Sequence, residues 1–415
     1  MCTAVEKIFQ KHVGRMVRAN DIVVTEIDGC MVHDVNGPAA VRFFREIAEN
    51  VKNPERQMIV LDHFAPSPNV NASNNHQILR QFAREQGIRL VDVCQGVCHK
   101  VMLEAGMVRP GGIVVGTDSH SCTYGALNAF STGIGAAEAA VIFAGGKCWF
   151  RIPETIRVEV EGSLPAGVTG KDIILEIIRI LGEGGANYRC LEFGGTAMRE
   201  ISFDQRVTMC NMAIECGAKG AIMPCDSITL EWMRAHRIPE TGGIAADPDA
   251  QYFRKIEIDI SKLRPLVAVS PDITHVVPAE ELHHIKVDQV VLGSCTNGRY
   301  EDFLMAAEIL EGRHIAPGVR MLVFPASPEI QRRMQETGID DILSHAGAAV
   351  FPPNCGPCAG LHLGLLGDGE VTVTTTNRNN AGRMGSKAAG LFVASSVTAA
   401  YSALNGFISA GEGDR

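Results

Sequence analysis

Three cysteines in the last third of the 415-residue chain have a spacing that suits metal binding. Cys355 and Cys358 form a Cys-x-x-Cys pair in CGPCAG, and Cys295 lies between two glycines in GSCTNGR. A Cys-x-x-Cys pair alone fits a zinc half-site, a redox pair or two ligands of an iron–sulfur cluster. One lone thiolate with a pair suits three corners of a [4Fe–4S] cluster, whose fourth iron could hold a hydroxyl and a carboxylate. From spacing alone, an iron–sulfur cluster, zinc and a purely structural role all stay open.

Histidines with carboxylates nearby are the candidate acid–base groups. They are His63 beside Asp62, His99 in GVCHKV, and His120 with Asp118 in TDSHS. A carboxylate next to an imidazole orients the ring, raises its pKa and lets it deliver a proton. Asn211 and Glu215 lie four residues apart in CNMAIECGA, which predicts that they share one face of a helix. The remaining histidines, including His33 and His76, have no comparable neighbours and receive no catalytic role.

Two arginines, Arg378 and Arg383, lie in NRNNAGRMG, a segment of small and turn-forming residues. Two guanidinium groups on one loop can each bind a carboxylate through two parallel hydrogen bonds. We therefore predict that this loop binds an acidic substrate, although arginines on a solvent-exposed loop are the plainer interpretation.

The elements that must position these groups are strands and helices in alternation, which predicts an α/β fold with largely parallel sheets. The predicted strands are 57–61, 89–93, 112–115, 155–160, 288–292, 319–324, 348–351 and 371–375, and the predicted helices are 38–51, 76–86, 171–182, 205–216, 301–311 and 328–337. Polar clusters directly follow five of these strands, at 62–63, 117–120, 294–297, 355–358 and 377–378. Ligands bind beyond the carboxyl ends of strands in open α/β sheets, so these clusters predict one shared site.

Length and composition limit the class of protein. At roughly 150 residues per domain the chain suggests two to three domains. A net charge of −9 is a poor match for nucleic acid or an anionic membrane. The 13 cysteines and the absence of a signal-peptide pattern predict a cytoplasmic protein with reduced thiols. Residues 388–410 carry no charge but contain too many polar residues for a membrane span, so we predict one packed helix there.

Six motifs in order resemble those of the aconitase superfamily, namely DHFAP, GTDSHSCTYGAL, CNMAIECGA, GSCTNGR, CGPCAG and NRN-x-x-GRMG. The resemblance runs from about residue 4 to 408 and is closest to the separate large subunits of isopropylmalate dehydratases and homoaconitases. It implies three α/β/α domains around a central [4Fe–4S] cleft. We place them at 1–152, 153–282 (with an extended crossing segment near 261–281) and 283–415, the last carrying the cluster ligands.

The resemblance also implies roles for single residues. Cys295, Cys355 and Cys358 resemble the ligands of one [4Fe–4S] cluster per subunit, whereas Cys94 and Cys98 are expected to be dispensable. The residues that resemble catalytic groups are Asp62 and His63, His99 with Asp118, and His120 with Glu215. Those that resemble contacts to the substrate or to the cluster region are Ser119, Asn211, Asn377, Arg378 and Arg383. The sequence departs from the family pattern at Asn380, where an aromatic is usual, and at Lys100, where Gln is common.

The function implied is that of a hydro-lyase that dehydrates and rehydrates a hydroxy di- or tricarboxylic acid. Isopropylmalate isomerisation in leucine biosynthesis is the first expectation, with homoaconitate or a methylated malate such as dimethylmalate as alternative substrates. Single-chain aconitases carry a further swivelling domain, for which this chain has no length left, so we expect a small subunit to supply it in a heterodimer or heterotetramer. Two rivals, an RNA-binding regulator and a cluster-free structural subunit, belong to other classes, and the acidic charge disfavours the first.

Overall fold

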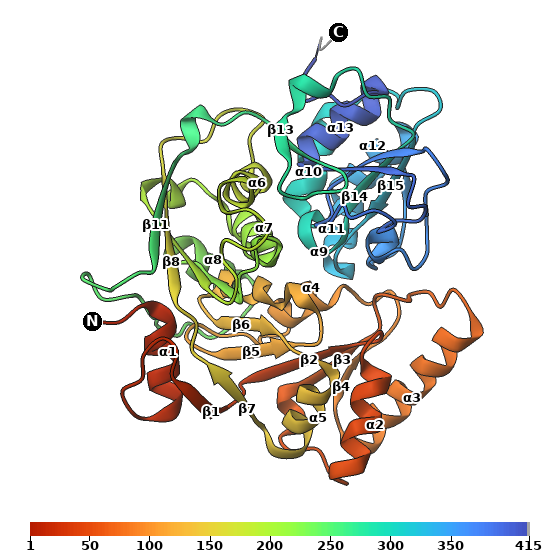
Figure 1. The fold of residues 1–415 in the computed structure, drawn as a ribbon. Helices are drawn as coiled ribbons and strands as arrows, with labels where there is room; N and C mark the ends of the chain where they lie inside the picture. Colours follow the sequence, from red (N-terminus) through yellow and green to blue (C-terminus); the bar gives the residue numbers. More distant parts are fainter. Residues whose placement is uncertain (413–415) are drawn as a thin grey trace.

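The computed structural model describes residues 1–412 and contains three larger β-sheets and one two-stranded ribbon. Figure 1 shows the larger sheets in three lobes, which meet around the short helices α4 (Cys98–Glu104) and α9 (Ser294–Asn297). We name the lobes first, second and third in chain order. No helix in the described part of the chain is long and apolar enough to cross a membrane.

The first lobe is built on a five-stranded parallel sheet in the order β4-β3-β2-β5-β6. Its strands are β2 (Gly29–His33), β3 (Gln57–Val60), β4 (Arg89–Val91), β5 (Ile113–Gly116) and β6 (Phe130–Gly133), and its helices include α1 (Ala4–Val13), α2 (Gly37–Ile47), α3 (Val70–Gln86) and α5 (Ala136–Gly145). Every residue of β2, β3 and β5 is buried, as expected for a parallel sheet covered on both faces. The antiparallel ribbon of β1 (Ile22–Glu26) and β7 (Lys147–Arg151) lies beside it.

The second lobe contains a four-stranded parallel sheet in the order β10-β9-β8-β11. Its strands are β8 (Thr155–Glu161), β9 (Cys190–Gly194), β10 (Gly220–Ile222) and β11 (Arg254–Asp259), and its helices are α6 (Gly170–Leu181), α7 (Phe203–Met212) and α8 (Ser227–Ala235). Helix α6 begins at a capping box of Thr169 and Asp172. Its isoleucines recur at helical spacing and are buried, so one face of α6 packs into the core.

The third lobe contains a seven-stranded mixed sheet in the order β13-β12-β18-β17-β14-β15-β16. Its strands are β12 (Leu266–Val269), β13 (Val276–Pro278), β14 (Gln289–Gly293), β15 (Arg320–Phe324), β16 (Ala349–Val350), β17 (Val371–Thr374) and β18 (Gly390–Ala394). Strand β12 pairs antiparallel with β13 and with β18, and all other neighbouring strands of this sheet pair in parallel. The helices, besides α9, are α10 (Tyr300–Leu310), α11 (Pro328–Glu336), α12 (Ile339–His345) and α13 (Ser396–Asn405).

The predicted α/β class is confirmed, and each predicted strand overlaps an observed one. The single helix predicted over 388–410 is wrong. Its first part is β18, whose buried residues pair in parallel with β17, and α13 begins only after Ser395 caps the Thr398 amide. The predicted helix over 205–216 ends earlier, at Met212, and continues as a 3₁₀ turn.

The extended crossing segment near 261–281 contains β12 and β13, which pair with each other and join the sheet of the third lobe. Two strands within the range 153–282 therefore hydrogen-bond into the sheet that carries the cysteine loops. The three domain ranges themselves stay predictions.

Candidate active site and cluster site

A small buried cavity lies where the three lobes meet, and the predicted chemical groups line it. The polar and sulfur-containing residues of its wall are His63, Cys98, His99, Asp118, His120, Ser294, Cys295, Cys355, Cys358, Asn377 and Arg383. They follow β3, β4 and β5 in the first lobe, with Cys98 and His99 at the start of α4, and β14, β16 and β17 in the third. The expectation of one shared site beyond the strand ends thus agrees with where the structure places these residues.

Two glycines let the cysteine loops turn tightly over Phe324. Gly293 ends β14 with φ +127°, and a Cβ there would lie 2.1 Å from the Phe324 carbonyl oxygen. Gly356, between Cys355 and Cys358, has φ +58°, and a Cβ there would lie 2.8 Å from the Phe324 ring. Only glycine fits both the dihedral angle and the space at these positions, so both loops are fixed against the end of β15.

The three cysteines are buried and their sulfurs face polar groups. The side-chain amides of Asn211 and Asn377 each place Nδ2 3.5 Å from Cys295 Sγ. Cys358 Sγ lies 3.6 Å from Asn377 Oδ1. Amide donors of this kind stabilise a sulfur that carries negative charge.

The donor set fits an iron–sulfur cluster. Burial raises the pKa of Cys295 to about 11 and that of Cys355 well above its ordinary value. A buried thiol becomes a thiolate when a metal replaces its proton. These cysteines are therefore better suited to bind a metal than to exist as thiolates without one. In the described chain the three sulfurs do not form a group within 4.8 Å of one another, unlike the atoms of Asp62, His63 and Cys355. The wider spacing suits a multi-iron cluster rather than one ion.

Two carboxylates contact the imidazole ring of His63. Its Nδ1 lies 2.8 Å from Asp62 Oδ1 and its Nε2 lies 3.6 Å from Asp118 Oδ2. Burial favours the neutral ring, but the Cys355 sulfur and these carboxylates outweigh burial and raise the pKa of His63 well above its ordinary value. The pKa of Asp62 falls to about 2, because His63 and the Cys98 amide outweigh the effect of its burial.

Asp118 lies at the centre of the histidines. Its Oδ1 accepts from His99 Nε2 at 2.9 Å and from the His120 amide at 2.7 Å, where Asp118 caps a 3₁₀ helix. His120 Nε2 in turn lies 2.7 Å from Glu215 Oε1. Burial alone would raise the pKa of Asp118, yet the three imidazoles hold it well below its ordinary value. The structure thus brings together both carboxylate–imidazole pairs inferred from the motifs.

The two loop arginines differ in their partners. Arg378 Nε donates to both oxygens of Glu215 at 2.9 and 3.1 Å, and its Nη2 donates to Ser119 Oγ at 3.1 Å. Burial disfavours its charge, but Glu215 reverses this and raises the pKa of Arg378. Arg383 lines the cavity, and its buried Nε has no hydrogen-bond partner in the described structure. Arg383 therefore has a donor free for a carboxylate.

Several residues at the site were missed by sequence reasoning. The His33 ring stacks on His63 with centroids 4.5 Å apart, and the Asp34 carboxylate accepts from the His63 amide at 3.1 Å and from His76 Nε2 at 2.9 Å. His33 is the last residue of the buried strand β2 and Asp34 directly follows it, so the rule that singled out the other clusters could have found them. Cys98 lines the cavity, and its amide donates to Asp62 at 2.8 Å.

The two departures from the family motifs lie outside the wall of the cavity. Lys100 Nζ lies 3.1 Å from Glu104 Oε1 and over the Trp232 ring, so its charge is engaged between the first and second lobes. Asn380 is exposed, and its carbonyl accepts from the Arg383 amide at 2.9 Å in the turn of the arginine loop.

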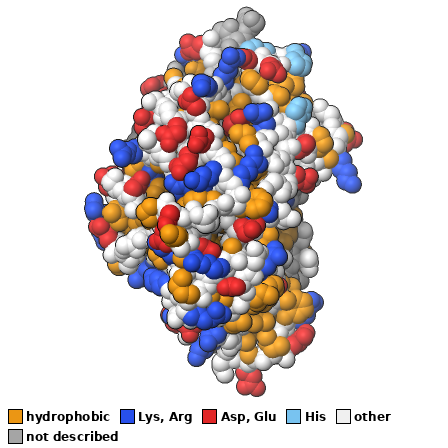
Figure 2. All heavy atoms as spheres, turned by 60° about the vertical axis from the view of Figure 1, so that its left-hand side comes forward, with side chains coloured by type: hydrophobic (Ala, Val, Ile, Leu, Met, Phe, Trp, Pro, Cys, Tyr) orange, Lys and Arg blue, Asp and Glu red, His pale blue; other side chains and the backbone are white. Residues whose placement is uncertain are grey.

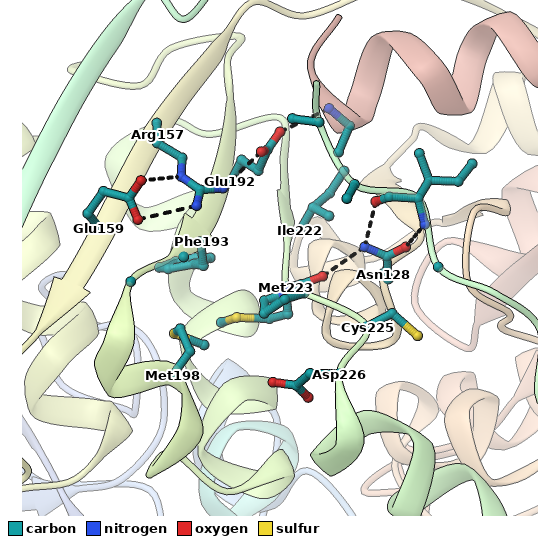
Figure 3. Close-up of a pocket in the computed structure, with 18 of the residues that line it drawn as sticks. Asn128, Arg157, Glu159, Glu192, Phe193, Met198, Ile222, Met223, Cys225 and Asp226 are labelled. Carbon is teal, nitrogen blue, oxygen red and sulfur yellow. Dashed lines mark hydrogen bonds and ion pairs between the residues drawn. The ribbon is translucent and has the colours of Figure 1, made fainter. Parts of the chain in front are cut away.

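A larger cavity of about 550 Å³ lies in the second lobe beside the N-terminal helix and holds none of the predicted residues. Figure 3 shows Arg157 between Glu159 and Glu192, at 2.9 and 3.0 Å. Asn128 Nδ2 donates to the Met223 carbonyl on another wall. The charges of Arg157, Glu159 and Glu192 in this larger cavity are paired with one another. The smaller cavity between the lobes instead contains the predicted cysteines and the unpaired Nε of Arg383.

Comparison with known proteins finds relatives that match nearly the whole chain. The chain is 48% identical to the 3-isopropylmalate dehydratase large subunit 1 of Methanopyrus kandleri, over 98% of each chain. It is 45% identical to the protein of the same name in Thermotoga maritima, again over 98% of each. It is 43% identical to a probable methanogen homoaconitase large subunit of Methanothermobacter thermautotrophicus, over 98% of this chain and 96% of that one.

A solved structure and a family model cover most of the chain as well. The crystal structure of Thermococcus kodakaraensis aconitase X in its holo-form superimposes with a TM-score of 0.50 at 13% identity, covering 91% of this chain and 90% of that one, which supports the fold alone. The model of the aconitase family (aconitate hydratase) matches residues 6–406. With its fold, its ordered motifs and this match, the chain belongs to the aconitase family.

Proposed function

We propose that this chain is the large subunit of a 3-isopropylmalate dehydratase, which moves a hydroxyl group by removing and re-adding water. The observation that carries the proposal is the cavity between the lobes, where three buried cysteines lie beside three carboxylate–imidazole pairs and an arginine with a free donor. Relatives named as large subunits of this enzyme match 98% of the chain, which supports the choice of reaction.

We propose one [4Fe–4S] cluster per chain, held by Cys295, Cys355 and Cys358. Membership of the aconitase family implies an iron–sulfur cluster, and the burial and amide contacts of the three sulfurs support these ligands. When bound, such a cluster supplies a Lewis-acid iron that polarises a hydroxyl and a carboxylate of the substrate.

His63 is the proposed general acid for the departing hydroxyl. Its proton is held by Asp62 and Asp118, so it enters the reaction charged, and its Nε2 faces the cavity wall formed by Asp118. A positioned acid of this kind contributes about two to four orders of magnitude in rate. The same ring, once neutral, can take a proton from water in the reverse direction.

The pairs of His99 with Asp118 and of His120 with Glu215 orient water and hydroxyl groups near the cysteines. Asp118 bonds both histidines, so the orientation of one ring is tied to that of the other. His99 has one nitrogen bound to a carboxylate, and His120 has both, Nδ1 to Asp118 and Nε2 to Glu215, which fixes the direction of each ring.

Arg383 and Arg378 are the proposed groups that bind the substrate carboxylates, with Ser119 beside Arg378. Glu215 fixes the fork of Arg378, whereas Arg383 Nε is free. The amides of Asn211 and Asn377 contact the cysteine sulfurs, and we assign them to the cluster end of the substrate site.

A small subunit completes the enzyme in this proposal. The relatives are named as large subunits, which implies a small partner. We propose that the partner brings the swivelling domain with the base that removes the carbon-bound proton, and that the assembly is a heterodimer or heterotetramer. Homoaconitate is the second candidate substrate, because one relative at 43% identity is named a probable homoaconitase large subunit.

The test is an anaerobic assay of the reconstituted two-subunit enzyme with isopropylmalate, homoaconitate and dimethylmalate. We expect the highest kcat/KM for isopropylmalate, and iron and sulfide near four each per chain (from the cluster formula). Higher kcat/KM for homoaconitate would replace the proposed substrate. Zinc without sulfide in anaerobically purified protein would refute the cluster itself.

A further inference from the structure

We propose that Lys171 and Arg299 are positioning residues of the cluster site: two buried cations that hold the loops of Cys295 and of Asn377 by their backbone carbonyls and place positive charge behind the cluster. The inference rests on the proposed function in so far as a cluster binds to the three cysteines. Neither residue lines the cavity, so neither acts on the substrate directly.

Lys171 joins the second lobe to the loop of the third lobe that carries the arginines. It lies in the first turn of α6, is 1% exposed, and its Nζ donates to the carbonyls of Thr375 and Thr376 at 2.7 and 2.9 Å. Thr376 directly precedes Asn377 and Arg378 in the chain. The ammonium therefore fixes the backbone from which both side chains extend toward the site.

A lysine is costly at this position. Positive charge in the first turn of a helix is opposed by the helix dipole. Burial lowers the pKa of Lys171 to about 7, although Asp302, Asp172 and the cysteine sulfurs favour its charge. An apolar side chain would fill the space without this cost, so the position is explained by what the ammonium contacts.

Arg299 acts in the same way on the loop of Cys295. It is 1% exposed, and its Nη1 and Nη2 donate to the carbonyls of Thr296 and Cys295 at 2.5 and 2.9 Å. The hydroxyl of Thr208, from α7 of the second lobe, also donates to the Thr296 carbonyl, at 2.8 Å. The loop that presents Cys295 is thus held by a cation of its own lobe and by a hydroxyl of the neighbouring lobe.

Together the two cations lie behind a group of opposite charge. Three thiolates outweigh the positive charge of an oxidised [4Fe–4S] core, and in a buried site charges interact more strongly than in water. Each cation also has a buried carboxylate near it. Asp302 accepts from the Arg299 amide at 3.0 Å, and Asp172, the residue after Lys171, accepts from the Leu266 amide at 2.8 Å. Removing a cation from this set makes the surroundings more negative and disfavours an added electron.

The experiment measures the midpoint potential of the cluster in anaerobically reconstituted protein, by redox titration followed by electron paramagnetic resonance. Lys171→Met removes the charge and the donors, Lys171→Gln keeps one donor without the charge, and Lys171→Arg keeps the charge. We expect a lower potential in Lys171→Met, Lys171→Gln and Arg299→Gln, and a potential near that of the wild type in Lys171→Arg. Lys171→Met should also lose its cluster several-fold faster in air.

The matched control is Lys219→Met. Lys219 is a half-buried lysine that also donates to a carbonyl of another lobe, at 3.3 Å, but that carbonyl belongs to Gly133 at the end of β6 and not to a loop that carries a proposed cluster residue. A shift in Lys219→Met equal to that in Lys171→Met, or a wild-type potential in Lys171→Gln, would overturn the inference. So would failure of every Lys171 variant to fold, Lys171→Arg included, because the lysine would then serve the whole fold. A wild-type chain without a cluster would instead refute the proposed function, before any variant is made.

Discussion

His63 keeps its proton in a buried position because acceptors surround it on both sides of the ring. Asp62 and Asp118 bind its two nitrogens, and the ring of His33 stacks on its face. The Val35 amide donates to His33 Nδ1 at 3.1 Å, so the His33 proton lies on Nε2, toward the Thr117 carbonyl. The His33 ring thus packs on the face of His63 with its own proton directed away, toward the Thr117 carbonyl.

The cysteine assignment makes a prediction at this scale. Cys295→Ser, Cys355→Ser and Cys358→Ser should each abolish the brown colour and the activity, because each removes one of three ligands. Cys98→Ala should keep the colour, although Cys98 lines the same cavity. Visible absorption and iron content after anaerobic reconstitution provide the measurement.

The control is Cys94→Ser, at a half-exposed cysteine outside the cavity wall. A colourless Cys98→Ala protein would mean that the cluster has four cysteine ligands and no open iron.

Arg383 is the side chain with which to test carboxylate binding. Arg383→Lys keeps the charge but loses the planar fork, and a charge-assisted hydrogen bond is worth about 1.5–3 kcal/mol. We expect kcat/KM to fall by about one to two orders of magnitude. Steady-state kinetics of the two-subunit enzyme measure the loss.

Arg332→Lys serves as the control, because Arg332 is an exposed residue that pairs with Glu336 on α11. Unchanged kinetics in Arg383→Lys would reduce the role of Arg383 to holding the loop.

At the residue scale the sequence indicated the groups but not their partners. The adjacency of Asp62 and His63 is visible in the chain, and they do pair. The bond between Arg378 and Glu215 joins residues 163 positions apart, so no local pattern could show that one loop arginine is already paired. The contacts of Asp34 with the His63 amide and with His76 span 29 and 42 positions, so only the rule of polar residues at strand ends could have pointed to His33 and Asp34.

At the scale of elements, the turn after β14 determines where Cys295 points. Gly293→Ala should destabilise the protein by several kcal/mol and prevent cluster binding, because the new Cβ would collide with the Phe324 carbonyl. Gly318→Ala is the control that measures the backbone strain without the clash. Gly318 also has a positive φ, +90°, but no atom lies within 4 Å of a new Cβ there.

We expect Gly318→Ala to cost about 1–2 kcal/mol and to leave the cluster bound. Urea unfolding and absorption spectra of the two variants provide the comparison. Equal losses in both would show that the dihedral angle alone explains the glycine.

The attachment of helix α1 to the five-stranded sheet predicts a pH dependence. His12 Nδ1 lies 2.7 Å from the Ile8 carbonyl and Nε2 lies 2.8 Å from Asp28, so both nitrogens face acceptors and both bonds need a proton. Burial opposes the charge, yet these partners raise the pKa of His12, and the same contact lowers the pKa of Asp28.

The His12–Asp28 ion pair contributes its full stabilisation at pH values between the ordinary pKa values of the two groups, 3.8 for Asp28 and 6.5 for His12. It is lost as the pH rises through the folded pKa of His12, or falls through that of Asp28. His12→Asn should therefore cost about 0.5–1 kcal/mol at pH 5.5 and less at pH 9. Urea unfolding at both values measures it, with His345→Asn as the control, because His345 Nδ1 bonds a carbonyl, that of Asp341. A cost that stays constant with pH would contradict the linkage.

Element types followed from local pattern where the apolar run was short and flanked by turns, as in β3 and β14. The run at 388–410 misled because strand β18 and helix α13 are both uncharged, and only pairing with β17 distinguishes them. The strands β12 and β13 lacked a periodic signal because they have only four and three residues, and a proline with turn residues separates them.

At the scale of the whole molecule, the need for a partner is the prediction. The chain alone should bind the cluster but not turn over, because the base for the carbon-bound proton is proposed to lie on the small subunit. Loss of a correctly placed base costs several kcal/mol of the barrier, so partial activity is not expected. The measurement is an anaerobic assay with and without the small subunit, after the cluster spectrum has been recorded.

Steady turnover by the large chain alone, free of contaminating partner, would refute this division of labour. The face shown in Figure 2 mixes acidic and basic side chains.

The cavity is made of contacts between distant parts of the chain: Cys355 Sγ lies 3.5 Å from an Asp62 oxygen across 293 positions of sequence. During synthesis the first lobe can fold while the Cys-x-x-Cys pair has not yet been made, since domains fold in order as the chain emerges. Thiols, acid and arginines therefore meet only after the last lobe has closed on the first. Iron delivered earlier would find at most one cysteine of the proposed set, which makes cluster insertion a late step in the synthesis of the chain.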